Sequence, residues 1–302
     1  DYFNGMFSII IYNEKTKDIF VARDRLGIKP LYVLNKGTKL IFSSEIESIL
    51  ELIQDEYDDF GIRQYLKLRM TIKGYTIYKN IKIFPPAHYW IGGKYIKYWD
   101  LRIEDGRPPH DDELIHLLND SVELRKRSDV PIGSYLSGGL DSTIVSLLLE
   151  PDDTWTVGFN ELNEFKWGEI ANKRLSSNFH KINVTREQFI ESLQFMVDKR
   201  KEPLSVPNEI MLYLMTKEVK KRNSVVLSGE GADELFFGYD RIFKWAYKNT
   251  DFQLSDFDEK YCYGSNEDNE ILDFAINGLP GKTLLDKIAY FFQIYHLHGL
   301  LR

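Results

Sequence analysis

Residues 132–142 read Ile132-Gly133-Ser134-Tyr135-Leu136-Ser137-Gly138-Gly139-Leu140-Asp141-Ser142. The stretch predicts a strand, a turn with two adjacent glycines, and the start of a helix. In an open α/β sheet, ligands bind beyond the carboxyl ends of the strands. A glycine turn at that point brings backbone N–H groups and the positive end of the helix dipole together. The stretch therefore predicts an α/β fold with an anion site in residues 137–142.

The side chains of this loop suit a nucleotide phosphate. Gly138 and Gly139 let the backbone approach phosphate oxygens because they carry no Cβ. Ser137 and Ser142 add hydroxyl donors, and Asp141 can hold Mg2+ against a pyrophosphate. The loop lacks the lysine of the kinase-type phosphate loop, so it is a different class of site. The alternative is an ordinary strand-to-helix turn in which the aspartate caps the helix. Two adjacent glycines alone would favour that alternative, but the complete six-residue sequence of 137–142 favours the phosphate site.

A second loop repeats the pattern after residues 224–227, whose sequence is typical of a buried strand. It reads Ser228-Gly229-Glu230-Gly231-Ala232-Asp233-Glu234. Glycines and carboxylates at the end of a strand do not pack well in an apolar core, and they suit a site that binds a metal and phosphate. The alternative is an acidic surface loop whose carboxylates cap a helix. We expect Asp141 and Asp233 to position Mg2+ jointly on the phosphates of ATP and so to stabilise pyrophosphate as the leaving group.

The chain changes character near residues 104–109, where a Pro- and Gly-containing segment predicts a linker. Before it, short strands with tight turns predict an antiparallel β-layer with one helix at 58–70. After it, strands alternate with helices, which predicts a parallel sheet covered by helices. The predicted fold class is thus α/β and α+β, with domains at 1–104 and 110–302. The expected elements of the second domain are strands at 132–136, 154–159 and 224–228 and helices at 111–127, 142–149, 164–176, 209–222 and 282–297.

Composition excludes several classes of protein. A net charge of −7 argues against a nucleic-acid partner. No stretch reaches the roughly 18 apolar residues of a membrane span, and the N-terminus lacks the features of a signal peptide. Cys262 is the single cysteine, which excludes an internal disulfide framework and fits a reducing compartment; we interpret it as a packing residue. We expect a cytoplasmic protein that binds neither nucleic acid nor membranes, in a chain that begins within a domain.

These motifs together resemble the glutamine-hydrolysing asparagine synthetase family. Residues 137–142 are similar to the signature of the PP-loop ATP pyrophosphatases, and residues 227–234 with Phe237-Gly238-Tyr239 to the synthetase domain of that family. Residues 5–7, 23–32, 43–45 and 85–88 resemble the later half of its glutaminase domain, with Ala87 in place of a usual glycine. The resemblance implies an Ntn-type glutaminase sandwich followed by a PP-loop synthetase domain.

The resemblance also implies roles for residues at matching positions. Leu136 and Val157 would contact adenosine through their backbones, and residues 137–142 would hold the pyrophosphate. Ser228 and Gly229 would line the nucleotide site, and Glu230 would govern formation of the acyl-adenylate. The catalytic set is thus Glu230, Asp141 and Asp233, with ATP and Mg2+ as cofactors. Residues 202–205 are either close to the acceptor pocket or simply a helix-breaking turn.

The implied reaction is that of a ligase. ATP would activate a carboxylate as its acyl-AMP with release of pyrophosphate, and ammonia derived from glutamine would then form the amide. Aspartate is the expected acceptor, which makes the product asparagine. Related enzymes act on a sugar acid or close a β-lactam or lasso-peptide ring, and a non-catalytic binding or assembly module is a third alternative. Against that module, both loops retain the charged residues that the chemistry needs. The partners expected for this reaction are small-molecule substrates, and the sequence is compatible with a homodimer.

Three departures from the family limit the expectation. The family's glutaminase nucleophile is an N-terminal cysteine, and no residue of this chain takes that part. Phe179 replaces the first of a histidine pair that the family often has, before His180. The family chain continues past Arg302 and there supplies a catalytic lysine. We therefore expect an incomplete glutaminase site and a synthetase domain truncated at its C-terminus.

Overall fold

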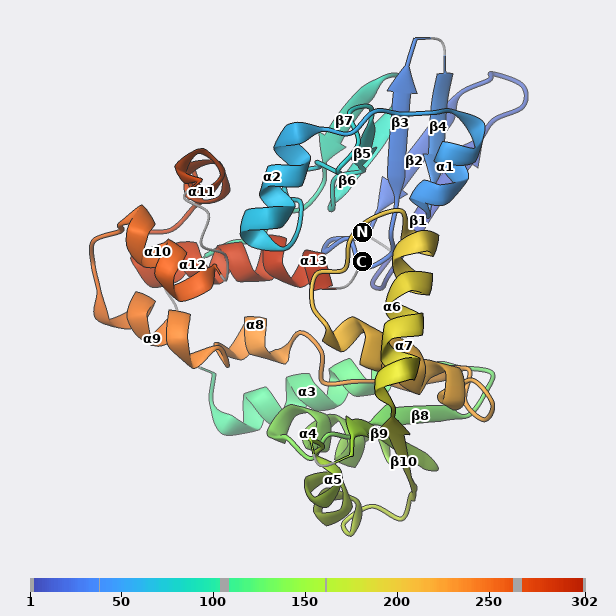
Figure 1. Ribbon diagram of the computed structural model, residues 1–302, viewed down its shortest axis with the longest axis vertical. Helices are drawn as coiled ribbons and strands as arrows, with labels where there is room; N and C mark the ends of the chain where they lie inside the picture. The colour runs from blue at the N-terminus through green and yellow to red at the C-terminus, as the bar shows by residue number, and fades with distance from the viewer. Residues whose placement is uncertain (1–2, 38, 104–108, 161, 263–267, 301–302) are drawn as a thin grey trace. The chain divides into compact units, whose positions relative to one another are not determined.

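The computed structural model describes residues 3–37, 39–103, 109–160, 162–262 and 268–300 (Figure 1). The chain divides into two compact units that alternate along the sequence. The first unit comprises Asp1–Glu104, Lys199–Ser205 and Asp233–Arg302, and the second comprises Asp105–Asp198 and Val206–Ala232. Most of the linker expected at 104–109 lies outside the described residues. The division into domains 1–104 and 110–302 stays a prediction.

The first unit contains two antiparallel sheets. Their strand orders are β1-β2-β6-β7 and β4-β3-β5, and every pair in them is antiparallel. The antiparallel region expected from the tight turns is confirmed. The strands are β1 Ser8–Tyr12, β2 Ile19–Arg23, β3 Tyr32–Lys36, β4 Lys39–Ser43, β5 Ile81–Ile83, β6 His88–Ile91 and β7 Lys94–Lys97.

Most helices of the first unit pack around one large apolar core, whereas the helix at Ile46–Leu52 packs in a separate cluster with strand residues such as Leu34 and Ile81. The large core includes the fully buried Phe257, Ile271 and Phe291, together with Cys262. The expected packing role of Cys262 agrees with this position. The final helix expected at 282–297 is interrupted by a π-helical turn. The helical elements are α1 Ile46–Leu52, α2 Asp59–Leu68, α8 Ala232–Phe236, α9 Asp240–Lys248, α10 Leu254–Tyr261, α11 Asn269–Ile276, α12 Leu284–Phe291, η1 Phe292–His296 and α13 Leu297–Leu300.

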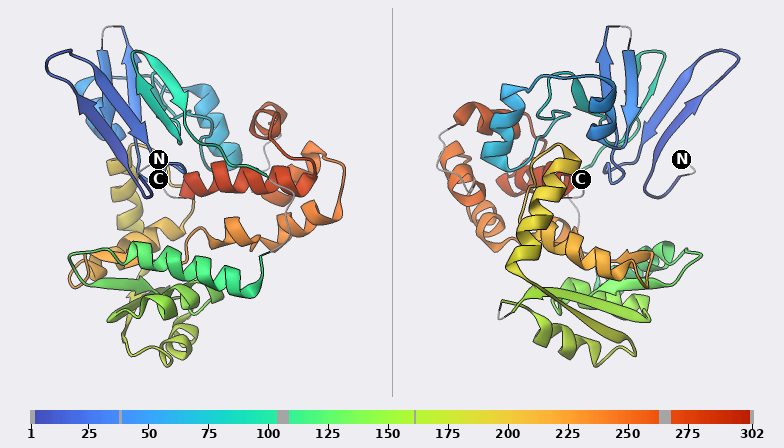
Figure 2. Two further views of the ribbon diagram at one scale, coloured as in Figure 1. Left: turned by 180° about the vertical axis from the view of Figure 1, so that it is seen from behind. Right: turned by 45° about the vertical axis from the view of Figure 1, so that its right-hand side comes forward.

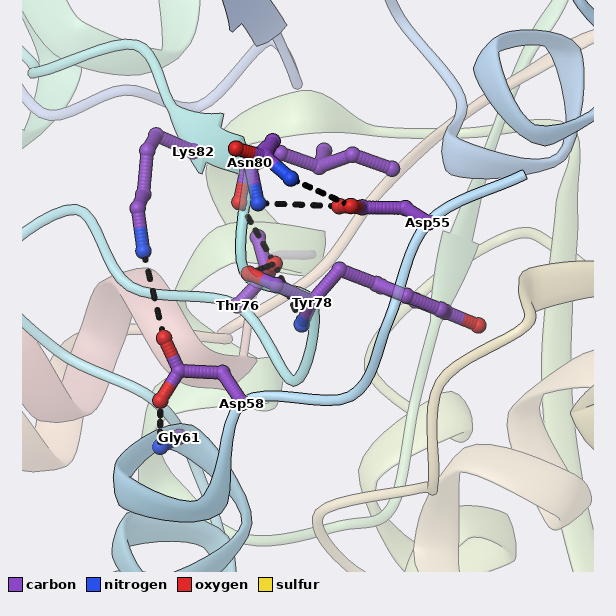
Figure 3. Close-up of polar contacts among 8 residues, drawn as sticks. Asp55, Asp58, Gly61, Thr76, Tyr78, Asn80 and Lys82 are labelled. Atoms are coloured by element: carbon purple, nitrogen blue, oxygen red, sulfur yellow. Dashed lines mark hydrogen bonds and ion pairs between the residues drawn. The ribbon is translucent and has the colours of Figure 1, made fainter. Parts of the chain in front are cut away.

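A polar network joins the start of α2 to the segment before and within β5 (Figure 3). Asp58 caps α2 by accepting the Gly61 N–H at 3.0 Å, and Lys82 donates to the same carboxylate at 3.4 Å. Asp55 accepts two hydrogen bonds from Asn80, at 2.9 and 2.6 Å. Burial alone would raise the pKa of Asp55, but these bonds, together with the Glu56 N–H and the charge of Lys36, outweigh it and hold the pKa below its usual value. The network therefore fixes the helix start against the sheet.

The second unit contains a four-stranded parallel sheet in the order β10-β9-β8-β11. Strands and helices alternate along most of this unit, and the predicted α/β class is confirmed. The strands are β8 Ile132–Tyr135, β9 Asp153–Phe159, β10 Asn178–Val184 and β11 Val225–Leu227. The helices are α3 Asp111–Arg125, α4 Leu140–Leu149, α5 Phe165–Asn172, α6 Arg186–Arg200 and α7 Asn208–Val219.

Helices cover both faces of this sheet (Figure 2). Trp155 of β9 packs with Met215 and Val219 of α7. The next residue, Thr156, lies on the other face, where its hydroxyl is close to Gly168 of α5. Successive strand residues point to opposite faces, so α7 and α5 lie on opposite sides of β9. No helix in the described ranges is both long and apolar enough to cross a membrane.

Candidate functional site

The carboxyl ends of three neighbouring strands form one edge of the parallel sheet. β8 lies between β11 and β9, and all three run in the same direction. The predicted loop 137–142 follows β8 after Leu136, and the predicted loop 228–234 follows β11 directly, with its last three residues at the start of α8. β9 continues to Phe159, beyond Trp155, its last residue in register with β8. The sheet topology therefore brings both glycine loops and the end of β9 to the edge where ligands bind in such sheets.

Serine hydroxyls close the first loop onto the start of α4. Ser137 Oγ accepts the Gly139 N–H at 3.2 Å and lies 2.9 Å from Ser142 Oγ. Ser142 Oγ in turn lies 3.3 Å from the Gly139 carbonyl oxygen, to which it can donate. Gly139 is the N-cap of α4, and no side chain caps that helix. The first-turn N–H groups of α4 are therefore suited to meet an anion.

Gly138 is required both for its backbone conformation and for the space around it. Its φ is 88°, in the region that favours glycine. A Cβ at this position would lie 2.3 Å from the Trp167 carbonyl carbon and 2.6 Å from the Gly168 nitrogen. The beginning of α5 thus packs directly against the loop. The sequence did not indicate this contact, because Trp167 follows the next strand along the chain.

The second loop lies against the first turn of α4. A Cβ on Gly229 would be 2.8 Å from the Ser142 nitrogen and 3.0 Å from the Asp141 Cβ. Behind the loops, the buried Ser134 hydroxyl lies 2.8 Å from the Ser146 hydroxyl and donates to the Leu227 carbonyl at 3.2 Å. These contacts tie β8, α4 and β11 together, so the two predicted loops form a single surface.

Leu136 and Val157 differ in how deeply they lie in the sheet, since Leu136 is buried and Val157 is partly exposed. Leu136 is fully buried, its N–H donates to the Trp155 carbonyl at 2.9 Å, and its carbonyl accepts the Thr156 hydroxyl. Val157 is half-buried and packs in the apolar cluster beneath α7. It lies on the part of β9 that extends past β8. Contacts of both backbones with adenosine stay a prediction.

The acidic residues of the second loop are divided between the two units. Ser228 and Glu230 are exposed in the second unit, and the Glu230 N–H is 3.4 Å from Ser228 Oγ. Asp233 belongs to the first unit, whereas Asp141 is half-buried at the start of α4. Among the described residues, no group of three or more His, Cys, Asp or Glu side chains could hold a metal ion. Mg2+ usually binds through one or two carboxylates and substrate phosphates, and the joint binding of Mg2+ by Asp141 and Asp233 stays a prediction.

Residues 202–205 follow α6 and are held within the first unit by tyrosine hydroxyls. Tyr32 donates to the buried Glu202 carboxylate at 3.3 Å, and Tyr65 donates to the Leu204 carbonyl at 2.6 Å. The sequence offered two interpretations of this segment, an acceptor-pocket segment and a helix-breaking turn. The hydrogen bonds anchor this segment to β3 and α2, and both interpretations stay predictions.

Comparisons with known proteins identify the class of the chain. Residues 1–99 match the profile of the glutamine amidotransferase domain, and residues 113–288 match that of asparagine synthase. The two matches show that the chain combines a glutamine amidotransferase region with an asparagine synthase region. The chain belongs to the asparagine synthase family, which confirms the resemblance inferred from the loops.

Several curated proteins are similar to the chain over most of its length. Asparagine synthetase [glutamine-hydrolyzing] 1 of Bacillus subtilis is 35% identical over 252 residues, covering 78% of this chain and 40% of that protein. Putative asparagine synthetase [glutamine-hydrolyzing] 2 of Methanocaldococcus jannaschii is 34% identical, covering 78% of this chain and 50% of that protein. Amidase chry2 of Gibberella zeae is 26% identical, covering 79% of this chain and 40% of that protein. The chain thus spans half or less of the length of these relatives.

Proposed function

We propose that the protein carrying this chain activates a carboxylate with ATP as an acyl-adenylate, releases pyrophosphate, and converts the adenylate to an amide with ammonia from glutamine. The observation that carries the proposal is the contact of Gly229 with Asp141 and Ser142. It joins two glycine loops at the carboxyl edge of a parallel sheet, where nucleotide phosphates bind in this kind of fold.

Residues of the two loops would divide the work of binding and activation. Ser137 and Ser142 would hold the pyrophosphate part of ATP, together with the N–H groups at the start of α4. Mg2+ held by Asp141 and Asp233 would neutralise charge on the phosphates. Glu230, exposed beside Gly229, would govern formation of the acyl-adenylate. Ser228 and Gly229 would line the nucleotide, with Leu136 and Val157 at the adenosine.

The match of residues 1–99 to the glutamine amidotransferase domain supports glutamine as the source of ammonia. Relatives named glutamine-hydrolysing asparagine synthetases support aspartate as the acceptor and asparagine as the product. A second candidate keeps the same adenylation chemistry and amidates a different carboxylate; in its support, the relatives include a protein that is not named as an asparagine synthetase. The two candidates share every loop residue described above, so they differ only in the acceptor.

The test is pyrophosphate release by the full-length protein with ATP, Mg2+ and ammonium salt, measured with a panel of carboxylates. We expect release that depends on aspartate and an equal yield of AMP and asparagine. Release with another carboxylate, such as a uronic acid, and not with aspartate would favour the second candidate. Failure of every carboxylate to release pyrophosphate, in a folded protein that binds no ATP, would refute the adenylation proposal.

A further inference from the structure

A tight return turn, Phe237-Gly238-Tyr239, connects α8 to α9. Phe237 has a φ of 62°, an uncommon conformation for a bulky residue. Its ring packs 4.7 Å from that of Phe243 on α9, and the Gly238 N–H donates to the Asp233 carbonyl at 2.9 Å. A strained residue persists only where its surroundings determine its conformation. The turn is therefore held in one shape by contacts on both sides.

Gly238 lies directly beside the carboxylate of Asp233. A Cβ on Gly238 would be 1.8 Å from Asp233 Oδ1 and 2.8 Å from Asp233 Cγ. Cβ atoms essentially never lie within 3.0 Å of a non-bonded atom, so even a methyl group at position 238 would force the carboxylate to turn away. The missing side chain at position 238 thus permits the observed orientation of Asp233.

The next residue of the turn holds the neighbouring carboxylate. The Tyr239 hydroxyl donates to Glu234 Oε1 at 2.6 Å, and the Glu234 side chain is only 1% exposed. Gln293 donates to the Glu234 carbonyl at 3.3 Å. A buried carboxylate that accepts a short, charge-assisted hydrogen bond is held firmly in one place. Glu234 therefore anchors α8, the short helix that also carries Asp233.

We infer that the turn is a positioning element for Asp233: the missing side chain of Gly238 permits the observed orientation of that carboxylate, and the Tyr239–Glu234 hydrogen bond fixes the helix that carries it. The inference rests on the proposed function, in which Asp233 helps to hold Mg2+ on the phosphates. Gly238 and Tyr239 contact neither the nucleotide nor the reacting atoms in this proposal. They act through the side chain and the helix that they hold.

The first test measures binding of Mn2+, as a spectroscopic substitute for Mg2+, to the full-length protein with a non-hydrolysable ATP analogue. Electron paramagnetic resonance reports the free Mn2+. Because loss of an outer partner of a metal ligand commonly weakens metal affinity about 10–100-fold, we expect a loss of that size in Gly238→Ala. The matched control is Gly5→Ala, because no atom lies within 4 Å of a Cβ placed there.

A double-mutant cycle shows whether Gly238 acts through Asp233. In an Asp233→Ala background the carboxylate is gone, so Gly238→Ala should weaken Mn2+ binding no further. Losses that simply add would overturn the inference. Tyr239→Phe adds no atoms and removes only the hydroxyl, so it tests the positioning role even if Gly238→Ala does not fold. We expect this variant to bind Mn2+ more weakly as well.

The outcomes separate the inference from the function on which it rests. If the unaltered protein binds no Mn2+ with the analogue, the proposed function fails. If the unaltered protein binds Mn2+ and both Gly238→Ala and Tyr239→Phe bind it equally well, the proposed function stands and the positioning role is refuted.

Discussion

Arg23 lies 3.0 Å from His298, with its Nη2 facing the imidazole Nε2, and this contact joins the end of β2 to α13. The Arg23 guanidinium is fully buried and also donates to the carbonyls of Lys29, Phe84 and Gly27, at 2.8, 2.6 and 2.7 Å. Arginine has only donors, so His298 Nε2 must accept, and the histidine proton resides on Nδ1. Residues at opposite ends of the chain thus share one buried hydrogen-bond network.

We expect Arg23→Ala to lower the free energy of unfolding by about 3 kcal/mol or more, because it leaves buried carbonyl groups without donors. Urea unfolding followed by circular dichroism would measure the loss. Arg25→Ala is the matched control, since Arg25 is exposed on the same turn, and it should change stability by about 0.5 kcal/mol at most. Equal stabilities of the two variants would contradict the network.

His296 should make stability depend on pH in the acid range. Burial, and to a lesser extent the charge of Arg69, lowers the pKa of His296 to about 4. Between about pH 4 and 6.5 the unfolded chain binds a proton that the folded protein does not, so stability falls as the pH falls through this range. The buried imidazole also meets Glu234 Oε1 at 3.8 Å and the Tyr261 hydroxyl at 2.9 Å.

The check is urea unfolding of the unaltered protein and of His296→Gln at pH 7 and pH 5. We expect the drop in unfolding free energy between these two values to be smaller in the variant, by about 2 kcal/mol. His116→Gln provides the control, because His116 is exposed on α3. An identical drop in the unaltered protein and in His296→Gln would show that His296 is not the group that titrates.

Cys262 should be unreactive in the folded protein. Burial raises the pKa of its thiol to about 12, and the thiolate is the nucleophile. At pH 8 only about one thiol in ten thousand is ionised at such a pKa. Mass spectrometry after treatment with iodoacetamide should therefore find no modification of the native protein and complete modification in urea. Rapid labelling without denaturant would mean that Cys262 is accessible.

Gly229→Ala should impair nucleotide binding through the loop contact. A Cβ there would lie 2.8 Å from the backbone nitrogen of Ser142, so the second loop would have to move away from α4. We expect ATP to bind about tenfold more weakly or worse, by isothermal titration, since overpacking of this kind costs about 1–3 kcal/mol. Gly5→Ala should bind ATP normally. If Gly229→Ala binds ATP with unchanged affinity, the contact between the two loops is not needed for nucleotide binding.

Local signals in the sequence predicted much of the second unit. Apolar strands followed by glycine loops located β8 and β11, and their alternation with helices predicted a parallel sheet. β10 was missed because Asn178–Val184 contains His180, Lys181 and Asn183, which weaken the apolar signal of a strand. In the structure, β10 is defined by its parallel pairing with β9, residue for residue from Asn178 opposite Asp153 to Val184 opposite Phe159. α9, α10 and α11 were missed as well, and they are short helices whose apolar faces pack in the core around Phe257 and Phe291.

The sequence by itself determined that two glycine loops follow the strands β8 and β11, because apolar residues typical of strands give way there to glycine, serine and carboxylates. It did not determine what the loops contact. Gly138 meets the backbone of Trp167, and Gly229 meets Asp141, only after the sheet has assembled. Gly238 meets the Asp233 carboxylate only because of how the chain returns after α8. In each contact a glycine without a Cβ lies against backbone or side-chain atoms of other residues. Such contacts leave no periodic pattern in the chain, so only the folded structure decided them.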